Sequence, residues 1–270
     1  MTLVVHVEGV GVIGPGFDGW SATRAALAGE APWQAAASVI PPVTLLAANE
    51  RRRAGLLVRS SLAVAEQAVE MSGRAAASLP SIFTSSSGDG VNCHTICETL
   101  ASDDRSISPT RFHNSVHNAP AGYWTIATQS MTASTSLCAH DASFAAGRLD
   151  ACVQVASGAD AVLLVASDSG YPEPLNGVRP ISDVFAIGLV LASAPSERTV
   201  ARLSLQLEPT ATGAADRTRL DHVGWESVRS TIPAARALNL LLALANAGTT
   251  AEPVHIDYLD TLDLIAEVSR

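Results

Sequence analysis

The sequence contains no lysine, so all 17 of its basic side chains are arginines. Acidic residues outnumber them at 26, which gives a net charge of −9. The one dense basic run is Arg51-Arg52-Arg53, at the start of a segment with helical spacing. Nucleic-acid-binding proteins typically carry a basic stripe or a strongly basic domain. The charge pattern therefore argues against a nucleic-acid partner and predicts a solvated helix face for the arginine run.

Long hydrophobic runs are also missing. A membrane-spanning helix needs roughly 20 apolar residues, and the longest apolar candidate, residues 237–247, has the length of a core helix. Residues 1–16 lack the basic segment and cleavage pattern of a secretion signal, and they read as a first strand. We therefore expect a cytoplasmic protein without a membrane span.

Charged residues are scarce at 16%, whereas hydrophobic residues make up 47% of the chain. This balance excludes a disordered chain and indicates a large buried core. Cysteine is scarce too, with four residues, at positions 93, 97, 138 and 152. Cys93 and Cys97 are one helical turn apart, but no second pair follows at zinc-like spacing, which favours a buried pair of free thiols. We expect no metal, no cofactor and no disulfide.

Segments of strand and helix character alternate along the chain. Strands are predicted at residues 3–13, 80–84, 161–166, 185–194, 199–207, 254–258 and 262–268. Helices are predicted at residues 19–28, 49–73, 91–99, 119–129, 141–157 and 232–247. The polar segment 208–230 predicts a disordered or mobile loop. Together these elements predict an α/β layered fold with a mixed sheet and helices on both faces.

Residues 132–158 carry the most informative local pattern. Small and β-branched residues lead into a tight corner, Cys138-Ala139-His140-Asp141, and a helical pattern follows. Asp141 is placed to cap that helix by accepting from backbone N–H groups in its first turn. Cys138 fits a small buried side chain, as free cysteines usually are. Cys138 and His140 also offer a thiolate and a base, so a stand-alone acyl-thioester hydrolase or acyltransferase is an alternative hypothesis.

Six segments, in order, resemble the β-ketoacyl synthases of the thiolase fold. They are VHVEGVGVIGPG with LAGE, SSSGDG, SPTRFHNSVHNAPAGYWTIAT, the Asp141 corner with its helix, SGADAVLLVASD, and RPISDVFAIGLVLAS. The resemblance covers residues 3–195, which correspond to the first half of a synthase. It implies a single thiolase-like domain over residues 1–270, truncated relative to a full ketosynthase, in which residues 196–270 form a short C-terminal completion.

Two departures from the family pattern imply that the condensing machinery is missing. Synthases place a nucleophilic cysteine seventeen residues before the glycine that ends the helix; counting back from Gly158 gives Asp141, and Cys138 lies three residues too early. A carboxylate cannot hold the acyl chain as the thioester that condensation needs. The family's two catalytic histidines come from its C-terminal half, and here only His222 and His255 lie beyond the corner, outside any HGT or GHT motif.

Family members without the nucleophile are chain-length factors, which pair with an active synthase and line part of its acyl tunnel. The short form resembles most the synthase-like subunits of aryl polyene and xanthomonadin-type pigment clusters. The resemblance therefore implies a heterodimer with an active ketosynthase, and contact with acyl carrier protein through that complex, in aryl polyene, polyketide or fatty-acid-type biosynthesis. A lone chain can homodimerise through the same face. The implied tunnel and interface residues are Phe112, His113, Tyr123, Trp124 and Met131, of which Tyr123 and Trp124 also fit an ordinary core.

Overall fold

The computed structural model describes residues 2–181, 183–210, 218–248 and 253–270. Within these ranges the strands form one nine-stranded sheet with the order β4-β3-β5-β6-β1-β7-β9-β8 and with β2 beside β1. The strands are β1 (Leu3–Gly14), β2 (Phe17–Asp18), β3 (Ser81–Thr84), β4 (Ser134–Leu137), β5 (Ala161–Asp168), β6 (Phe185–Ala192), β7 (Ala201–Pro209), β8 (Val254–Leu259) and β9 (Leu262–Ser269). Strand β3 runs parallel to β4 and β5, and the other neighbours are antiparallel.

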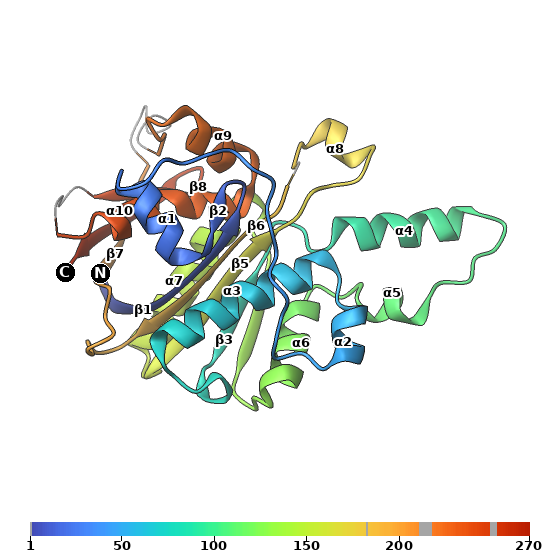
Figure 1. Cartoon of the computed structure of the whole chain (residues 1–270), viewed down its shortest axis with the longest axis horizontal. Coiled ribbons are helices and arrows are strands. Elements are labelled where there is room, and N and C mark those ends of the chain that lie inside the picture. The colour runs from blue at the N-terminus through green and yellow to red at the C-terminus, as the bar shows by residue number, and fades with distance from the viewer. Residues whose placement is uncertain (1, 182, 211–217, 249–252) are drawn as a thin grey trace.

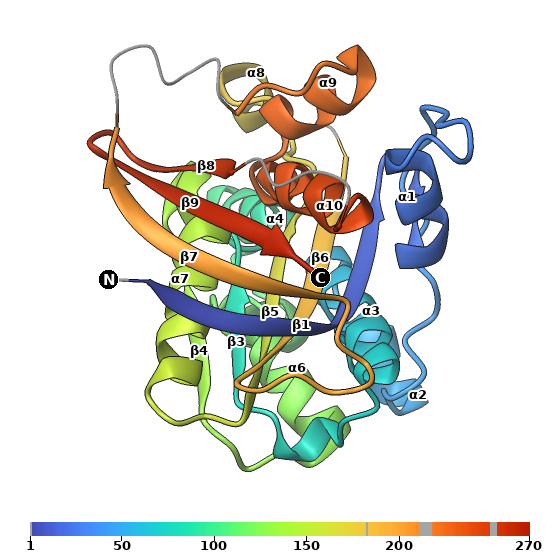
Figure 2. The ribbon, with the colours of Figure 1, turned by 90° about the vertical axis from the view of Figure 1, so that its left-hand side faces the viewer.

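Helices cover both faces of this sheet (Figure 1, Figure 2). One face packs against α3 (Leu56–Ser72) and α6 (Ala119–Thr128), and the other against α7 (Ser143–Ala156), η4 (Pro233–Ala237) and α10 (Leu238–Ala245). The remaining helices and turns are α1 (Gly19–Leu27), α2 (Ala48–Arg53), η1 (Ala76–Ser78), α4 (Gly90–Ala101), α5 (Pro109–His113), η2 (His140–Ala142), α8 (Leu175–Val178) and α9 (Val223–Thr231). The predicted α/β layers and mixed sheet are confirmed. No helix in the described ranges is long and apolar enough to cross a membrane.

Helix α3 lies unusually close to the centre of the sheet. Gly11 of β1 and Gly188 of β6 face each other in register beneath it. A Cβ atom at these positions would lie only 2.2 and 2.4 Å from the carbonyl oxygen of Val64. Only glycine permits such an approach of helix backbone to strand backbone. The close packing fixes the sheet, whose strand ends carry the candidate site.

Three predicted elements differ from the structure. The helix predicted over residues 49–73 is divided into α2 and α3, because the backbone is extended at Ala54 and Gly55. The loop predicted over residues 208–230 contains α9, whose His222 side chain accepts from the backbone N–H of Trp225 at the helix start; residues 211–217 lie outside the described ranges. The helix predicted from residue 232 begins as the 3-10 turn η4 before α10.

Helices α4 and α5 project from the body as an arm (Figure 1). Asn92 is the one buried residue that α4 contributes within the described structure, and α5 contributes none. The Asn92 amide donates to the carbonyl of Arg111 at 2.9 Å, which links the two helices of the arm. The arm therefore adds little to the core and presents most of its surface outward.

Candidate functional site

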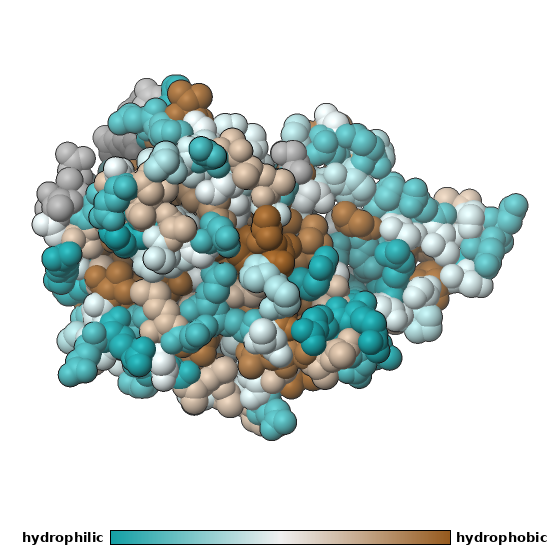
Figure 3. Space-filling model, viewed as in Figure 1, coloured by the Kyte–Doolittle hydropathy of each residue, from teal (hydrophilic) through white to brown (hydrophobic). Residues whose placement is uncertain are grey.

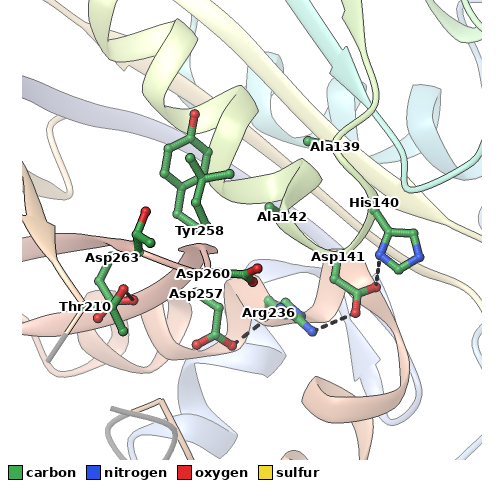
Figure 4. Close-up of a pocket in the computed structure, with 12 residues that line it drawn as sticks. Ala139, His140, Asp141, Ala142, Thr210, Arg236, Asp257, Tyr258, Asp260 and Asp263 are labelled. Carbon is green, nitrogen blue, oxygen red and sulfur yellow. Dashed lines mark hydrogen bonds and ion pairs between the residues drawn. The ribbon is translucent and has the colours of Figure 1, made fainter. Parts of the chain in front are cut away.

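The carboxyl ends of the parallel strands β3, β4 and β5 meet at one edge of the sheet. Loops at such an edge commonly carry the functional residues of α/β proteins. Here β4 ends at Leu137, and the chain turns through η2 into α7. His140 has a φ of 50°, in the left-handed region that few non-glycine residues adopt. This sharp corner positions Asp141 (Figure 4).

Two arginines hold the Asp141 carboxylate. Arg179, in the loop after β5, donates to Oδ1, and Arg236 of η4 donates to Oδ2 at 3.0 Å. Helix α7 begins two residues later, and within the described structure the Asp141 side chain caps no helix N–H group. The predicted N-cap is therefore wrong. Hydrogen bonds from guanidinium groups to a carboxylate are charge-assisted and about twice as strong as those between neutral groups.

Arg179 also joins the loops around the corner. Its Nη1 donates to the Tyr171 hydroxyl at 3.0 Å, and its guanidinium carbon lies 5.8 Å from the centre of the Tyr171 ring. The same hydroxyl forms a hydrogen bond with the Ser87 hydroxyl, in the loop after β3. The segments that follow β3, β4 and β5 are therefore tied together through Arg179.

Asp168, the last residue of β5, anchors this network from within the core. Its side chain is 3% exposed. Oδ1 accepts from the backbone N–H of Ser86 at 2.7 Å, and Oδ2 accepts from that of Ala234 at 2.8 Å. Burial raises the pKa of Asp168, although the hydrogen bonds from Ser86 and Ala234 act in the opposite direction. Asp168 thereby fixes both the loop after β3 and the turn η4 that carries Arg236.

An open cavity of about 780 Å³ lies between the corner and the β8–β9 hairpin (Figure 4). Arg236 crosses it, because its Nη1 lies 3.5 Å from Oδ2 of Asp257 while its Nη2 holds Asp141. Asp260 and Asp263 also line the cavity, so four carboxylates and Arg236 share its wall with alanine, threonine, tyrosine and leucine side chains. In the described residues, no cluster of three or more His, Cys, Asp or Glu side chains can hold a metal ion.

Cys138 and His140 have different partners. The Cys138 thiol donates to the carbonyl of Ser86 at 2.7 Å, whereas Nδ1 of His140 lies 3.5 Å from Asp141. No hydrogen bond joins Cys138 to His140 in the part of the chain that is described. Cys138 is also exposed, so the buried side chain expected from the sequence is wrong. Nucleophilic attack requires a base within reach of the thiol, and here the imidazole faces a carboxylate instead.

The five residues of the implied tunnel and interface segment lie in different environments. Phe112 and His113 are exposed on α5 and, with the buried Tyr123, line an apolar groove of about 470 Å³ between α5 and α6. Trp124 is fully buried in the core beneath α3. Met131, between α6 and β4, is 96% exposed. The structure brings three of the five together and separates the other two.

A family model described as β-ketoacyl synthase, N-terminal domain, matches residues 20–247. The chain belongs to this family. Among solved structures, it is similar to a chain of the complex between a ketosynthase and its chain length factor from Xenorhabdus doucetiae, with a TM-score of 0.72 and 19% identity over 98% of this chain and 99% of that chain. A search of the curated proteins finds no match.

Two further structures share the β-ketoacyl synthase fold. One is a type II polyketide acyl carrier protein in complex with its ketosynthase bound to the hexaketide, with a TM-score of 0.76, 12% identity and coverage of 100% of this chain and 99% of that chain. The other is the ishigamide ketosynthase/chain length factor, with a TM-score of 0.70, 13% identity and coverage of 98% and 99%. The expected thiolase-like ketosynthase fold is confirmed.

Sequence reasoning missed four residues of this synthase-like corner: Asp168, Tyr171, Arg179 and Arg236. Asp168 ends a buried strand and Tyr171 and Arg179 follow it, at the edge where functional loops of α/β folds gather. Arg236 is the one charged residue in the apolar segment 232–247. A charged side chain inside an apolar segment usually has an ionic partner, and that signal was available in the sequence.

We expect Asp141→Ala to lower the free energy of unfolding by about 1–3 kcal/mol, because two cations then face each other without their carboxylate. Acetate should restore part of the loss by occupying the vacated position, whereas chloride at equal ionic strength should not. Thermal unfolding with each salt measures both effects. Glu30→Ala is the matched control, because the Arg24–Glu30 pair is exposed on both sides and such pairs contribute about 0–1 kcal/mol. An equal acetate effect in both variants contradicts the prediction.

Proposed function

We propose that this chain is a non-catalytic ketosynthase-like subunit, a chain-length factor, which pairs with an active β-ketoacyl-ACP synthase and shapes its acyl tunnel in aryl polyene, polyketide or fatty-acid-type biosynthesis. The observation that carries the proposal is the ion-paired Asp141 at the corner where synthases place their nucleophile. A carboxylate held by two arginines is not the thiolate that would carry the acyl chain as a thioester. In this proposal residues 1–270 act as one domain, in which the strands of residues 196–270 extend the sheet begun by residues 3–195.

The surface around β4 supports a protein partner. Strand β4 lies at the edge of the sheet, where its outer backbone groups are available to a strand of another chain. Exposed apolar side chains lie on α5, on α6 and in the segments next to α6, namely Phe112, Val116, Ile126 and Met131, and α6 packs beside β4. Exposed apolar patches of this kind mark interaction sites. We assign this face to the ketosynthase, or to a second copy of the chain when the ketosynthase is missing.

The groove between α5 and α6 supports a role in limiting the length of the acyl chain. Phe112, His113 and Tyr123 line it with large side chains, and Trp124 supports α6 from the core. In a filled apolar space, each additional methylene costs on the order of 1–3 kcal/mol. A partner that covers this groove would close one end of a tunnel, and these side chains would then determine where growth stops.

The basic surface of α2 supports contact with an acidic carrier protein. Arg52 and Arg53 are exposed there, and Figure 3 shows a strongly hydrophilic surface over this helix. The net charge of −9 repels an acidic partner. The exposed arginines of α2 attract such a partner locally. We expect Arg52→Glu/Arg53→Glu to weaken carrier-protein binding to the complex by about tenfold at low salt, with a smaller difference at high salt.

The matched control for α2 is Arg202→Glu/Arg270→Glu, which makes the same change of charge on β7 and at the C-terminal residue. The C-terminus lies on the side of the molecule opposite α2 (Figure 1). Titration of the carrier protein into each complex, at two salt concentrations, measures the difference. Equal weakening by both double variants would show a general charge effect and would remove the assignment to α2.

The proposed function is tested by co-expression with active β-ketoacyl-ACP synthases from the organism that encodes this chain. Native mass measurement is expected to give a one-to-one complex, and carrier-bound chain elongation is expected to require both subunits. The isolated chain is expected to have no condensing activity. A chain that stays a homodimer and leaves elongation unchanged would overturn the proposal.

The second candidate is a stand-alone acyl-thioester hydrolase or acyltransferase, and the observation that favours it is the exposed thiol of Cys138. It requires turnover of an acyl thioester by the isolated chain and loss of that turnover in Cys138→Ala. Cys152→Ala is the control, because Cys152 is buried in α7. Turnover that survives in Cys138→Ala would rule out this candidate.

A further inference from the structure

The projecting helix α4 carries two cysteines one helical turn apart. Cys93 and Cys97 are both exposed, so the buried pair expected from the sequence is wrong. The reason is that α4 leaves the body and buries Asn92 but neither thiol. Positions four residues apart share one face of a helix, with Cβ atoms about 5–6 Å apart, and Cys93 and Cys97 occupy such positions on α4. The regular helix backbone therefore holds both cysteines on one exposed face of α4, where the Cys93 thiol is partly covered by its neighbours.

The surroundings of this pair decide what it can bind. His94, next to Cys93 in the sequence, is paired with Glu98 at 3.2 Å. No third His, Cys, Asp or Glu joins the thiols in a cluster able to hold a metal ion, as far as the chain is described. A structural zinc ion requires four protein ligands, so this pair does not suit it. The two thiols instead suit an atom that needs only two sulfur ligands from the protein.

The protonation state of the pair is set by its environment. Burial, followed by the neighbouring Cys97, raises the pKa of the Cys93 thiol. At neutral pH Cys93 is therefore a protonated thiol and a weak nucleophile toward simple alkylating agents. A ligand that forms bonds to both sulfur atoms displaces both protons, and the second bond forms without further loss of chain entropy because the helix has already placed the sulfur.

We propose that Cys93 and Cys97 form a dithiol site for thiophilic electrophiles that accept two sulfur ligands, with trivalent arsenicals as the representative class. With phenylarsine oxide, two As–S bonds form and the two S–H bonds and the As=O bond break. The two thiol protons leave with the oxygen as water, and arsenic stays trivalent, so no oxidant or reductant is involved. The site is separate from the corner at Asp141 and does not depend on the proposed function.

The test is intact-mass titration of the full-length chain with phenylarsine oxide. We expect one tight adduct with loss of one water, which is reversed by a small dithiol and resists an equal concentration of a monothiol. Cys93→Ser and Cys97→Ser should each weaken binding by about a hundredfold, because a chelate loses its intramolecular second step. Cys138→Ser is the matched control, since Cys138 is an exposed thiol on a different element, and it should bind as the wild type does.

Circular dichroism of each variant checks that the fold is retained. The exposed positions on α4 make serine a mild replacement there. An adduct that persists in Cys97→Ser, or that a monothiol removes as readily as a dithiol, would overturn the proposal. Loss of the adduct in Cys138→Ser alone would place the reactive sulfur at the corner and would overturn it as well.

Discussion

Replacing Arg148 with methionine is expected to raise the free energy of unfolding by about 2–4 kcal/mol, in the range found when buried charged groups are replaced by apolar residues. Arg148 lies on the inner face of α7 and is 1% exposed. Its Nε, Nη1 and Nη2 atoms are all buried without a hydrogen-bond partner in the described structure. The centre of the Phe144 ring lies 6.0 Å from the guanidinium carbon. Methionine retains the length of the side chain and removes the buried charge.

The effect of Arg148 should depend on pH. Burial lowers the pKa of this guanidinium to about 10, well below its value in an unfolded chain. At pH values between the pKa of Arg148 in the folded chain and its pKa in the unfolded chain, the unfolded chain binds more protons. The destabilisation caused by Arg148 therefore becomes smaller as the pH rises. The gain in free energy of unfolding of Arg148→Met over the wild type should therefore be largest at pH 8 and should become smaller above about pH 10.

Urea unfolding at pH 8 and pH 10.5 measures both parts of this prediction. Arg202→Met is the control, because Arg202 is exposed on β7 and surface substitutions usually change stability by less than about 0.5 kcal/mol. A less stable Arg148→Met variant would contradict the prediction and would show that the charge has a partner in the folded protein.

Asp168→Ala is expected to lower the free energy of unfolding by about 2–5 kcal/mol. It removes the acceptor of two buried backbone N–H groups, those of Ser86 and Ala234, and each unpaired group costs about 1–3 kcal/mol. Asp168→Asn keeps one carbonyl acceptor and should lose roughly half as much. The loop after β3 and the turn η4 should then lose their common anchor, so that hydrogen exchange at Ser86 and Ala234 becomes faster.

The matched control for Asp168 is Asp160→Ala, just before the other end of β5. Asp160 also accepts a hydrogen bond, from Arg74 at 2.7 Å, but its side chain is 82% exposed. Exposed ion pairs contribute at most about 1 kcal/mol. Chemical unfolding and hydrogen exchange are measured for both variants. An equal loss of free energy of unfolding in Asp168→Ala and Asp160→Ala would mean that the burial of Asp168 is not the source of its effect.

The fold could be predicted from the sequence because its signals are local. Strand alternation in residues 3–13 and helical spacing in residues 56–72 depend on neighbours a few positions away. The position of Asp141 at the corner could be predicted for the same reason, because it follows from counting seventeen residues back from Gly158. Its partners could not, because Arg179 and Arg236 are 38 and 95 residues further along the chain. The two arginines reach Asp141 only because β3 pairs in parallel with β4 and β5 and because η4 packs against this edge of the sheet. No local sequence pattern encodes either arrangement.

The cysteines show a second kind of failure. Periodicity indicated correctly that Cys93 and Cys97 share one helix face, but it could not indicate that the helix leaves the body of the protein. Burial of a helix face requires another layer opposite it, and among the described residues none forms such a layer over the thiol-bearing side of α4. The general preference of free cysteine for the interior was therefore a poor guide at three of the four positions.

The open edge at β4 has a consequence for how a cell must produce this protein. A strand edge without a neighbour is a template for unwanted association, and the short, serine-rich sequence of β4 limits that hazard without removing it. Under the proposed function, copies translated in excess of the ketosynthase would keep this edge and the projecting arm uncovered, which makes them targets for chaperones and proteases. We therefore expect the steady-state amount of the protein to follow the supply of its partner, even when its messenger RNA is overproduced.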